Sequence, residues 1–295
     1  MEKILFIVNP IAGGKDKKAI LEKVIGALDP DCFSHEVRYT EYAGHACTIA
    51  EEADADIVVA IGGDGTQNEV ARGLVGSGKR MGIIPCGSGD GLALHLGISR
   101  DPSKAARTIC EGKTVVIDHG TVNGRPFFCT TGMGIDALVS WKFANAGSRG
   151  LKTYIRESVK TWFGFKPDNY RINVDGVEYW NGPATLVTVG NANQWGNNAK
   201  ITPLASVKDG LLSMTRVGPF HTWAFPGLLI RLMSGTAHKS CHTTCLEGKV
   251  IRIERDHQGP VHFDGDPYSE GKSIEIKVVP QALKVIVPAT SVDRI

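Results

Sequence analysis

The stretch between residues 56 and 74 constrains the fold most, because it passes from a buried type of strand through glycines into a helix. Residues 56–61 are nearly all apolar and rich in β-branched side chains, which is typical of a strand covered on both faces of a parallel sheet. Three glycines follow within four positions, and Val70, Ala71 and Leu74 then recur at helical spacing. The sequence therefore predicts an α/β domain in which a glycine turn joins a strand to a helix N-terminus.

The glycine turn, Gly62-Gly63-Asp64-Gly65-Thr66, indicates a phosphate site. Glycines allow positive φ and let a ligand approach the backbone N–H groups, and a helix N-terminus favours an anion. A carboxylate among phosphates repels them unless a divalent cation lies between, so we expect Asp64 to hold Mg²⁺ directly or through water. The alternative is a plain turn in which Asp64 caps the helix.

Two more strand-to-helix loops contain glycines and polar residues. One follows a predicted strand at residues 3–8, and the other follows residues 81–85. In a doubly wound sheet, loops after the carboxyl ends of strands converge on one crevice, so we expect one nucleotide site built from all three loops. Neither the Walker pattern nor the dinucleotide GxGxxG pattern is present. The residues of these two loops that we expect at the site are Asn9, Lys15, Gly87, Ser88 and Asp90.

Beyond about residue 117 the chain has a β pattern. The dipeptides Asn123-Gly124 and Asp175-Gly176 are typical of hairpin turns and are flanked by strand-like runs. Helical stretches near residues 151–163 and 222–233 interrupt these runs. We expect an antiparallel sandwich or barrel with strands at residues 170–174, 185–189, 249–254, 261–263, 274–278 and 284–287.

Length and composition fit two domains in one chain. At 295 residues we predict domains at 1–117 and 118–295, with the last residues able to pack back on the first domain. A net charge of +2 says little about nucleic acid, but the sequence has no basic tract of the kind that reads a phosphate backbone, so we expect no nucleic-acid partner. The seven cysteines form no CxxC pair, and no apolar stretch reaches the roughly 18 residues of a spanning helix. We expect a reduced, cytoplasmic protein.

Two acidic motifs of the second half are candidates for chemistry. Asp264-Gly265-Asp266 places two carboxylates across a glycine at a strand end. One of them could accept a proton from an attacking hydroxyl, while the other orients it or joins a metal shell. Asp209 with nearby backbone carbonyls could form an oxygen-ligand cation site. A plain turn is the alternative for both motifs.

Residues 141–166 combine basic and aromatic side chains with one acid, Glu157. Such a composition favours docking at a membrane interface, and we expect peripheral membrane contact. The alternative is an amphipathic helix packed on the sandwich with solvated lysines, and a homodimer is left open. The basic residues are Lys142, Arg149, Lys152, Arg156, Lys160 and Lys166, and the aromatic ones are Trp141, Phe143, Tyr154, Trp162, Phe163 and Phe165.

Taken in order, these motifs resemble the diacylglycerol kinase catalytic-domain family, which includes bacterial soluble lipid kinases and the sphingosine and ceramide kinases. The resemblance covers nearly the whole chain. It implies an N-terminal α/β domain similar to those of phosphofructokinase and NAD kinase, a C-terminal β-sandwich, and a nucleotide cleft between them. It also implies Mg²⁺-dependent transfer of the γ-phosphoryl group of ATP to a hydroxyl of a membrane lipid.

The resemblance also implies roles for single residues. Asp266 stands where the family has its proposed catalytic base, with Asp64 and Asp264 as the other candidate acids. Asp209, with the carbonyls of Ser206 and Leu211, falls where bacterial members hold a structural metal. The implied nucleotide contacts are Asn9, Thr40, Gly62, Gly63, Asp64, Gly65, Thr66, Asn68, Glu69 and Ser88.

The sequence departs from the bacterial pattern at three positions. Asp90 takes the usual Asn position of the second glycine loop and Gly91 the usual Asp position, so the network around Asp64 must be rebuilt or weakened. Asp266 replaces the more usual Glu and is one methylene shorter. Because residues 87–93 look more like the GSGNALA of sphingosine and ceramide kinases, we expect a slight preference for a sphingoid base over diacylglycerol. The alternatives are an NAD kinase-like enzyme with a soluble acceptor and a non-catalytic relative that binds lipid or nucleotide.

Overall fold

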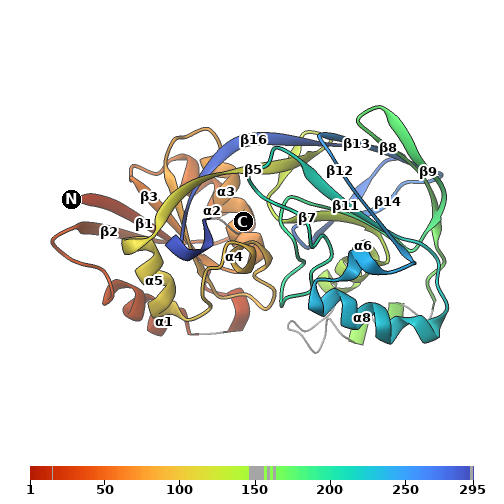
Figure 1. Cartoon of the computed structure of the whole chain (residues 1–295). Coiled ribbons are helices and arrows are strands. Elements are labelled where there is room, and N and C mark those ends of the chain that lie inside the picture. Colours follow the sequence, from red (N-terminus) through yellow and green to blue (C-terminus); the bar gives the residue numbers. More distant parts are fainter. Residues whose placement is uncertain (15, 146–155, 158–159, 162–163, 293–294) are drawn as a thin grey trace. The chain divides into compact units, whose positions relative to one another are not determined.

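The computed structural model describes residues 1–14, 16–145, 156–157, 160–161, 164–292 and 295 (Figure 1). The chain divides into two compact units, residues 1–118 with 281–295, and residues 119–280. The helix expected near residues 151–163 lies largely outside the described residues. So do these residues of the basic and aromatic stretch: Arg149, Lys152, Tyr154, Trp162 and Phe163.

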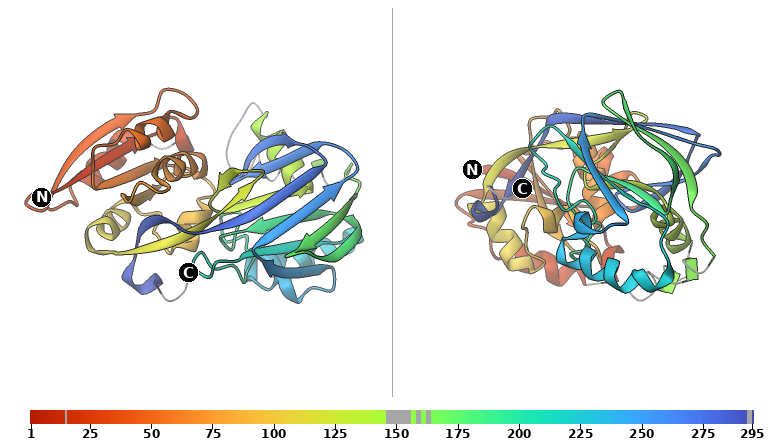
Figure 2. Two further views of the ribbon diagram at one scale, coloured as in Figure 1. Left: turned by 90° about the horizontal axis from the view of Figure 1, so that it is seen from above. Right: turned by 45° about the vertical axis from the view of Figure 1, so that its right-hand side comes forward.

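The first unit is built on a parallel sheet with the strand order β2-β1-β3-β4. Every residue of β3 is buried, as its apolar run predicts. Figure 2 shows the twist of these strands in the red and orange part of the chain. The strands are β1 (Glu2–Val8), β2 (Phe33–Tyr39), β3 (Ile57–Gly62) and β4 (Arg80–Pro85).

Helices cover both faces of this sheet. α2 packs against α3 and α1 packs against α5, and right-handed crossovers place the two pairs on opposite faces. Gly73 of α3 allows the close approach to α2, because a Cβ there would lie 2.5 Å from the carbonyl oxygen of Cys47. The helices are α1 (Lys17–Ile25), α2 (His45–Glu51), α3 (Asp64–Leu74), α4 (Gly91–His95) and α5 (Pro102–Glu111), with a 3₁₀ turn at Ala12–Gly14.

The second unit is a β-sandwich. One sheet has the order β12-β11-β10-β7-β14-β15 and is antiparallel throughout. The other contains β9, β8, β13 and the first part of β16, with β5 and β6 beside β16. Apolar side chains from both sheets form one core between them. The strands and helices are β5 (Lys113–Val122), β6 (Arg125–Phe127), β7 (Thr130–Gly134), α6 (Ile135–Ala144), β8 (Asp168–Val174), β9 (Val177–Ala184), β10 (Leu186–Gly190), β11 (Leu212–Val217), α8 (Phe225–Ser234), β12 (Thr243–Gly248), β13 (Val250–Arg255), β14 (Gly259–Phe263), β15 (Asp266–Glu270) and β16 (Ser273–Val287).

The predicted hairpin turns are confirmed, but the last two predicted strands are one. Asn123-Gly124 and Asp175-Gly176 have positive φ and join β5 to β6 and β8 to β9. Residues 274–278 and 284–287 belong to the continuous strand β16, within which Gln281 has φ +51°. The carboxylate of Asp118 accepts the N–H of Gln281 at 2.8 Å and supports this backbone conformation. Within the described part of the chain, no helix is long and apolar enough to cross a membrane.

Candidate active site

The glycine loops that follow β1, β3 and β4 pack backbone against backbone in the first unit. Gly13 has φ +61°, and a Cβ there would lie 1.7 Å from the carbonyl oxygen of Cys86. A Cβ on Gly63 would lie 3.1 Å from the Cα of Gly87. The loops after these neighbouring strands therefore come together, as the doubly wound topology requires.

Gly62 and Gly63, at the end of β3, serve close packing rather than an unusual backbone conformation. Gly63 has φ −93°, and Gly62 and Gly65 are not among the glycines with positive φ, so the expectation of positive φ here is wrong. Gly62 is required instead because a Cβ would lie 2.5 Å from the side chain of Thr66. The N-cap of α3 is Gly63, so no side chain caps this end of the helix among the described residues.

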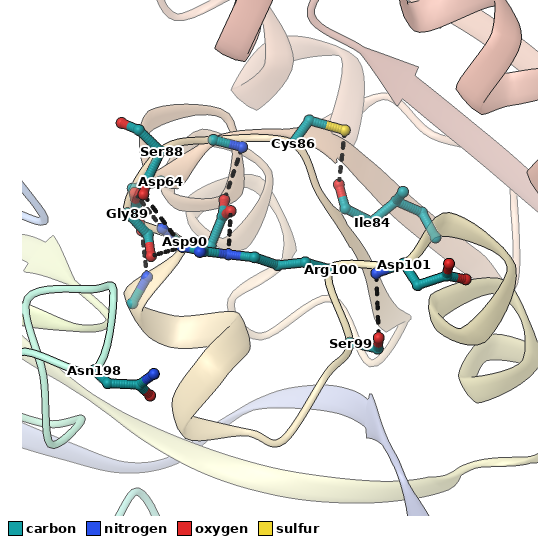
Figure 3. Close-up of polar contacts among 12 residues, drawn as sticks. Asp64, Ile84, Cys86, Ser88, Gly89, Asp90, Ser99, Arg100, Asp101 and Asn198 are labelled. Atoms are coloured by element: carbon teal, nitrogen blue, oxygen red, sulfur yellow. Dashed lines mark hydrogen bonds and ion pairs between the residues drawn. The ribbon is translucent and has the colours of Figure 1, made fainter. Parts of the chain in front are cut away.

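Asp64 is the first residue of α3 and holds the loop that follows β4. Its Oδ2 accepts the N–H of Asp90 at 2.9 Å, and its Oδ1 accepts the N–H of Gly91 at 2.7 Å (Figure 3). Hydrogen bonds to a carboxylate are stronger than those between neutral groups. A carboxylate has about four lone-pair sites, so it can accept hydrogen bonds and bind a cation at the same time.

Asp90 is fully buried and lies in the left-handed region with φ +51°. Its Oδ1 accepts the N–H of Gly87 at 2.9 Å and the side-chain N–H of Gln67 at 3.3 Å. The Nε of Arg100 lies 3.3 Å from its Oδ2 (Figure 3). The acid at this position is thus enclosed by donors and balanced by a guanidinium.

Arg100 was not singled out from the sequence, although the structure gives it several contacts in the second loop. Its guanidinium donates to the carbonyl oxygens of Ser88 at 3.2 Å and Gly89 at 2.6 Å, in addition to the ion pair with Asp90. The replacement of a neutral residue by Asp90 was the available signal, because a buried carboxylate needs a nearby cation. The contacts of Arg100 therefore explain in part how the loop after β4 accommodates an acid at position 90.

We expect Arg100→Ala to destabilise the first unit by roughly 1–3 kcal/mol, because it leaves the buried Asp90 carboxylate without its cation. The double variant Arg100→Ala/Asp90→Asn should recover most of this loss, since it removes the uncompensated charge. Thermal unfolding of both single variants and the double variant measures the coupling. The bonds to Ser88 and Gly89 are lost in either Arg100 variant. A double variant as unstable as Arg100→Ala would show that the charge of Asp90 is not the cause.

Other predicted nucleotide contacts hold the loops in place. The side chain of Asn9 donates to the Oγ1 of Thr66 at 3.0 Å. The carboxylate of Glu69 accepts the N–H groups of Gly44 at 2.8 Å and Ala46 at 3.1 Å, at the start of α2. These bonds tie α3 to the first loop and to α2. Of the remaining predicted contacts, Thr40 follows β2, Asn68 lies in α3, Ser88 is exposed, and Lys15 lies outside the described residues.

The two acids of the second unit occupy the turn of the β14–β15 hairpin. Asp264 and Gly265 have φ of +49° and +93°, and Asp266 begins β15 opposite Phe263. Asp266 is exposed, whereas Asp264 is only partly accessible. The backbone of this motif therefore forms a hairpin turn. Its two carboxylates differ in their exposure to solvent.

Asp264 fastens this turn to the segment that leads into β7. Its carboxylate accepts three backbone N–H groups, from Phe128 at 2.9 Å, Cys129 at 2.8 Å and Thr130 at 2.9 Å. An acceptor used in this way positions backbone, so Asp264 fixes where the hairpin tip and Asp266 lie.

A buried polar cluster beside this hairpin was not found from the sequence. The Oδ2 of Asp136 accepts the hydroxyl of Thr188 at 2.7 Å and lies 3.3 Å from the Nε2 of His262. All three side chains are buried, and a Cβ on Gly132 would meet each of them. Asp136, Thr188 and His262 lie far apart in the sequence, so a search for local motifs does not find this cluster.

The predicted structural cation site lies in a turn of the second unit. The Oδ1 of Asp209 accepts the N–H of Leu211 at 2.9 Å, and the Oγ of Ser206 accepts the N–H of Lys208 at 3.3 Å. In the part of the chain that is described, no group of three or more His, Cys, Asp or Glu side chains could hold a metal. A cation at Asp209 or Asp64 would therefore need carbonyl, water or phosphate oxygens as further ligands.

Comparisons with known proteins agree with this architecture. Residues 3–122 match the diacylglycerol kinase catalytic domain, and residues 129–287 match the YegS C-terminal NAD kinase beta sandwich-like domain. The chain belongs to the diacylglycerol kinase catalytic-domain family, with a YegS-type C-terminal domain. The family resemblance and the predicted fold class, an α/β domain followed by a β-sandwich, are thereby confirmed.

Similar proteins span nearly the whole chain. "Probable lipid kinase YegS-like" of Klebsiella pneumoniae (strain 342) is 29% identical over 280 residues, which are 91% of each chain. The protein of that name from Yersinia enterocolitica is 29% identical over 299 residues, 98% of each chain. The structure of a diacylglycerol kinase candidate from Bacillus anthracis str. Sterne superposes with a TM-score of 0.82, 25% identity and 99% coverage of each chain.

A more distant structure shares the fold alone. An NAD kinase from Archaeoglobus fulgidus, in complex with ATP, superposes with a TM-score of 0.56 at 12% identity and covers 99% of this chain and 96% of that one. Family membership makes this chain a kinase of the lipid kinase family, and this family implies the use of ATP.

Proposed function

We propose that the protein transfers the γ-phosphoryl group of ATP to a hydroxyl of a membrane lipid. The observation that carries the proposal is the position of Asp64, which begins α3 and binds the backbone of the loop after β4 through both carboxylate oxygens. This arrangement places a carboxylate, an uncapped helix N-terminus and two glycine loops in one place. Phosphoryl transfer depends mainly on holding and neutralising a triphosphate, which is what such an arrangement provides.

The backbone around α3 suits the phosphates of a nucleotide. The helix N-terminus carries partial positive charge, and its N-cap, Gly63, contributes no side chain. The packing of Gly63 against Gly87 leaves little room for a Cβ. A phosphate would therefore meet backbone N–H groups, with Asn9, Thr40, Asn68 and Ser88 as the nearby polar side chains that we propose as further contacts.

The residues present also suit Mg²⁺. Proteins bind this ion through one or two carboxylates together with waters and substrate phosphates, and do not need a cage of side chains. Asp64 is oriented by its hydrogen bonds from Asp90 and Gly91, and a carboxylate can bind a cation alongside such bonds. When bound, Mg²⁺ would neutralise phosphate charge. We also propose that Asp209 binds a structural cation together with the carbonyl oxygens of Ser206 and Leu211.

Asp266 is our candidate for the general base. It is exposed at the hairpin tip, and the three hydrogen bonds of Asp264 hold that tip. In this role its carboxylate accepts the proton of the lipid hydroxyl while the hydroxyl oxygen bonds to the γ-phosphorus. The bond from that phosphorus to the bridging oxygen breaks, and ADP leaves.

We expect Asp266→Asn to lower kcat by roughly 10²–10⁴, which is the usual contribution of a positioned base. Its thermal unfolding should match that of the unaltered protein, because the side chain is exposed. Transfer of radiolabelled γ-phosphate to diacylglycerol, sphingoid bases, ceramide and NAD is the assay. Asp266→Glu, which places the more usual residue of the family, is the matched control and should remain active. Full activity of Asp266→Asn would contradict the assignment.

The acceptor preference follows from the second glycine loop. Its resemblance to the loop of sphingosine and ceramide kinases favours a sphingoid base slightly over diacylglycerol. The same panel of acceptors tests this preference through the ratio of kcat/KM values. Transfer to NAD alone would replace the lipid kinase proposal by an NAD kinase-like one, and ATP binding without transfer to any acceptor would indicate a non-catalytic relative.

A further inference from the structure

Helix α8 (Phe225–Ser234) is strongly apolar, yet none of its residues is buried. Leu229 is 46% exposed, Ile230 is 69% exposed and Met233 is 48% exposed. Trp223, in the 3₁₀ turn just before the helix, is 79% exposed. Single exposed apolar side chains are ordinary, but a contiguous group of large ones marks an interaction site.

The exposed side chains form one stripe along the helix. Met233 lies four residues after Leu229 and three after Ile230, so it adjoins both along one side of the helix. Leu232 faces the protein and packs on a small apolar cluster that contains Ile201 and Val217. Figure 1 shows α8 at the surface of the second unit. The helix is thus attached along one side and presents an apolar stripe on another.

The segment that carries this stripe contains basic residues and no acidic ones. The sequence contains no Asp or Glu from residue 210 to residue 246, whereas Arg231 of α8 and Lys239 of the 3₁₀ turn that contacts α8 are basic. Lys200 also lies at the end of α8, where its N–H donates to the carbonyl oxygen of Leu232 at 3.0 Å. An apolar stripe with a Trp and nearby basic residues, without acids, complements a bilayer that carries anionic head groups.

We propose that the α8 stripe, defined as Trp223, Phe225, Leu229, Ile230 and Met233, docks this protein on a bilayer that contains anionic lipid. The stripe is distinct from the basic and aromatic stretch at residues 141–166. The proposal rests on the proposed function in one respect, since a kinase of membrane lipids must reach a bilayer. Docking itself requires no catalysis and can be measured without it.

Vesicle binding of the full chain tests the proposal. We expect binding to phosphatidylcholine vesicles that contain about one-third phosphatidylglycerol, with weaker binding as the salt concentration rises. Ile230→Glu should weaken this binding by roughly tenfold or more, because it replaces an apolar contact with the bilayer by a charge. The matched control is Val177→Glu, which makes the same kind of change at a valine that is 54% exposed in the β8–β9 hairpin. This control should bind as the unaltered protein does.

Fluorescence gives a second measurement that does not depend on the added charge. Anionic vesicles should shift the emission of Trp223 to shorter wavelength, and a brominated lipid should quench it. Trp223→Phe should lose most of this signal while retaining its unfolding temperature. Equal vesicle binding by Ile230→Glu and the unaltered protein would overturn the proposal. A change from dimer to monomer in Ile230→Glu without loss of vesicle binding would also overturn it, and would assign the stripe to contact between copies.

The two proposals can fail separately. Vesicle binding that depends on α8, without phosphate transfer to any lipid, would leave docking in place and remove the proposed function. Phosphate transfer to a water-soluble short-chain lipid would support the proposed function. If vesicle binding were unaffected by Ile230→Glu and Trp223→Phe in the same protein, docking through α8 would be overturned.

Discussion

Asp64→Asn is expected to abolish detectable lipid phosphorylation, with kcat/KM lowered by roughly 10³ or more. The carboxylate accepts the N–H groups of Asp90 and Gly91 with separate oxygens. An amide has one acceptor oxygen, so its NH₂ group must face one of these donors. The variant also loses the negative charge that is proposed to bind Mg²⁺. Loop geometry and cation binding should therefore fail together.

The measurement pairs the transfer assay with ATP binding and thermal unfolding. The mismatched donors should cost roughly 1–3 kcal/mol of stability in the first unit, which leaves the fold intact. Asp54→Asn is the matched control in the same unit, because the side chain of Asp54 is fully exposed and pairs on the surface with Lys3 at 3.2 Å. Full activity of Asp64→Asn would remove the basis of the kinase mechanism proposed above.

Asp264→Ala is expected to lower the free energy of unfolding of the second unit by roughly 3 kcal/mol and to reduce activity through displacement of the hairpin tip. The change removes the acceptor of three backbone N–H groups. Asp264→Asn should lose less, because one amide oxygen can still accept the N–H groups of Cys129 and Thr130, which share Oδ1 in the present structure. The donor on Phe128 then lacks its partner.

Urea unfolding orders these variants. We expect the midpoint to fall from the unaltered protein to Asp264→Asn and further to Asp264→Ala, while Asp266→Ala in the same turn stays near the unaltered value. Equal midpoints for the two alanine variants would show that the hydrogen bonds of Asp264 do not hold the hairpin. The comparison separates an acid that positions backbone from an acid proposed to accept a proton.

Local patterns were sufficient to predict most of the fold. The buried run of β3, the glycines before α3 and the hairpin dipeptides each act within a few residues, where periodicity and turn preference are informative. The continuity of β16 was missed because Pro280 and Gln281 interrupt the strand pattern while the chain continues to pair with its neighbours. The role of Gly62 was misread, because glycine serves close packing and positive φ equally well and the sequence does not distinguish them.

Tertiary contacts within the candidate site could not be predicted in the same way. Asp264 binds Phe128 across 136 positions of the chain, and His262 meets Asp136 across 126. Asp90 and Arg100 are only ten positions apart. Their ion pair was still not predicted, because the need for a cation beside Asp90 arises from the burial of its carboxylate. Sequence reasoning identified the chemistry of Asp64 and Asp264 as acids but not their backbone partners, because those partners are defined by the fold.

The continuity of β16 through Gln281 limits how this protein can be divided. Because the end of β16 pairs in parallel with β4, at Lys284 with Arg80 and at Val285 with Met81, the first unit is made of two separate pieces of chain. The second unit is in effect an insertion within the first. A fragment that stops at residue 118 would lack this strand and leave β4 with an unpaired edge, which favours aggregation. A shortened protein that keeps the first unit whole must therefore join its two pieces by a linker in place of residues 119–280.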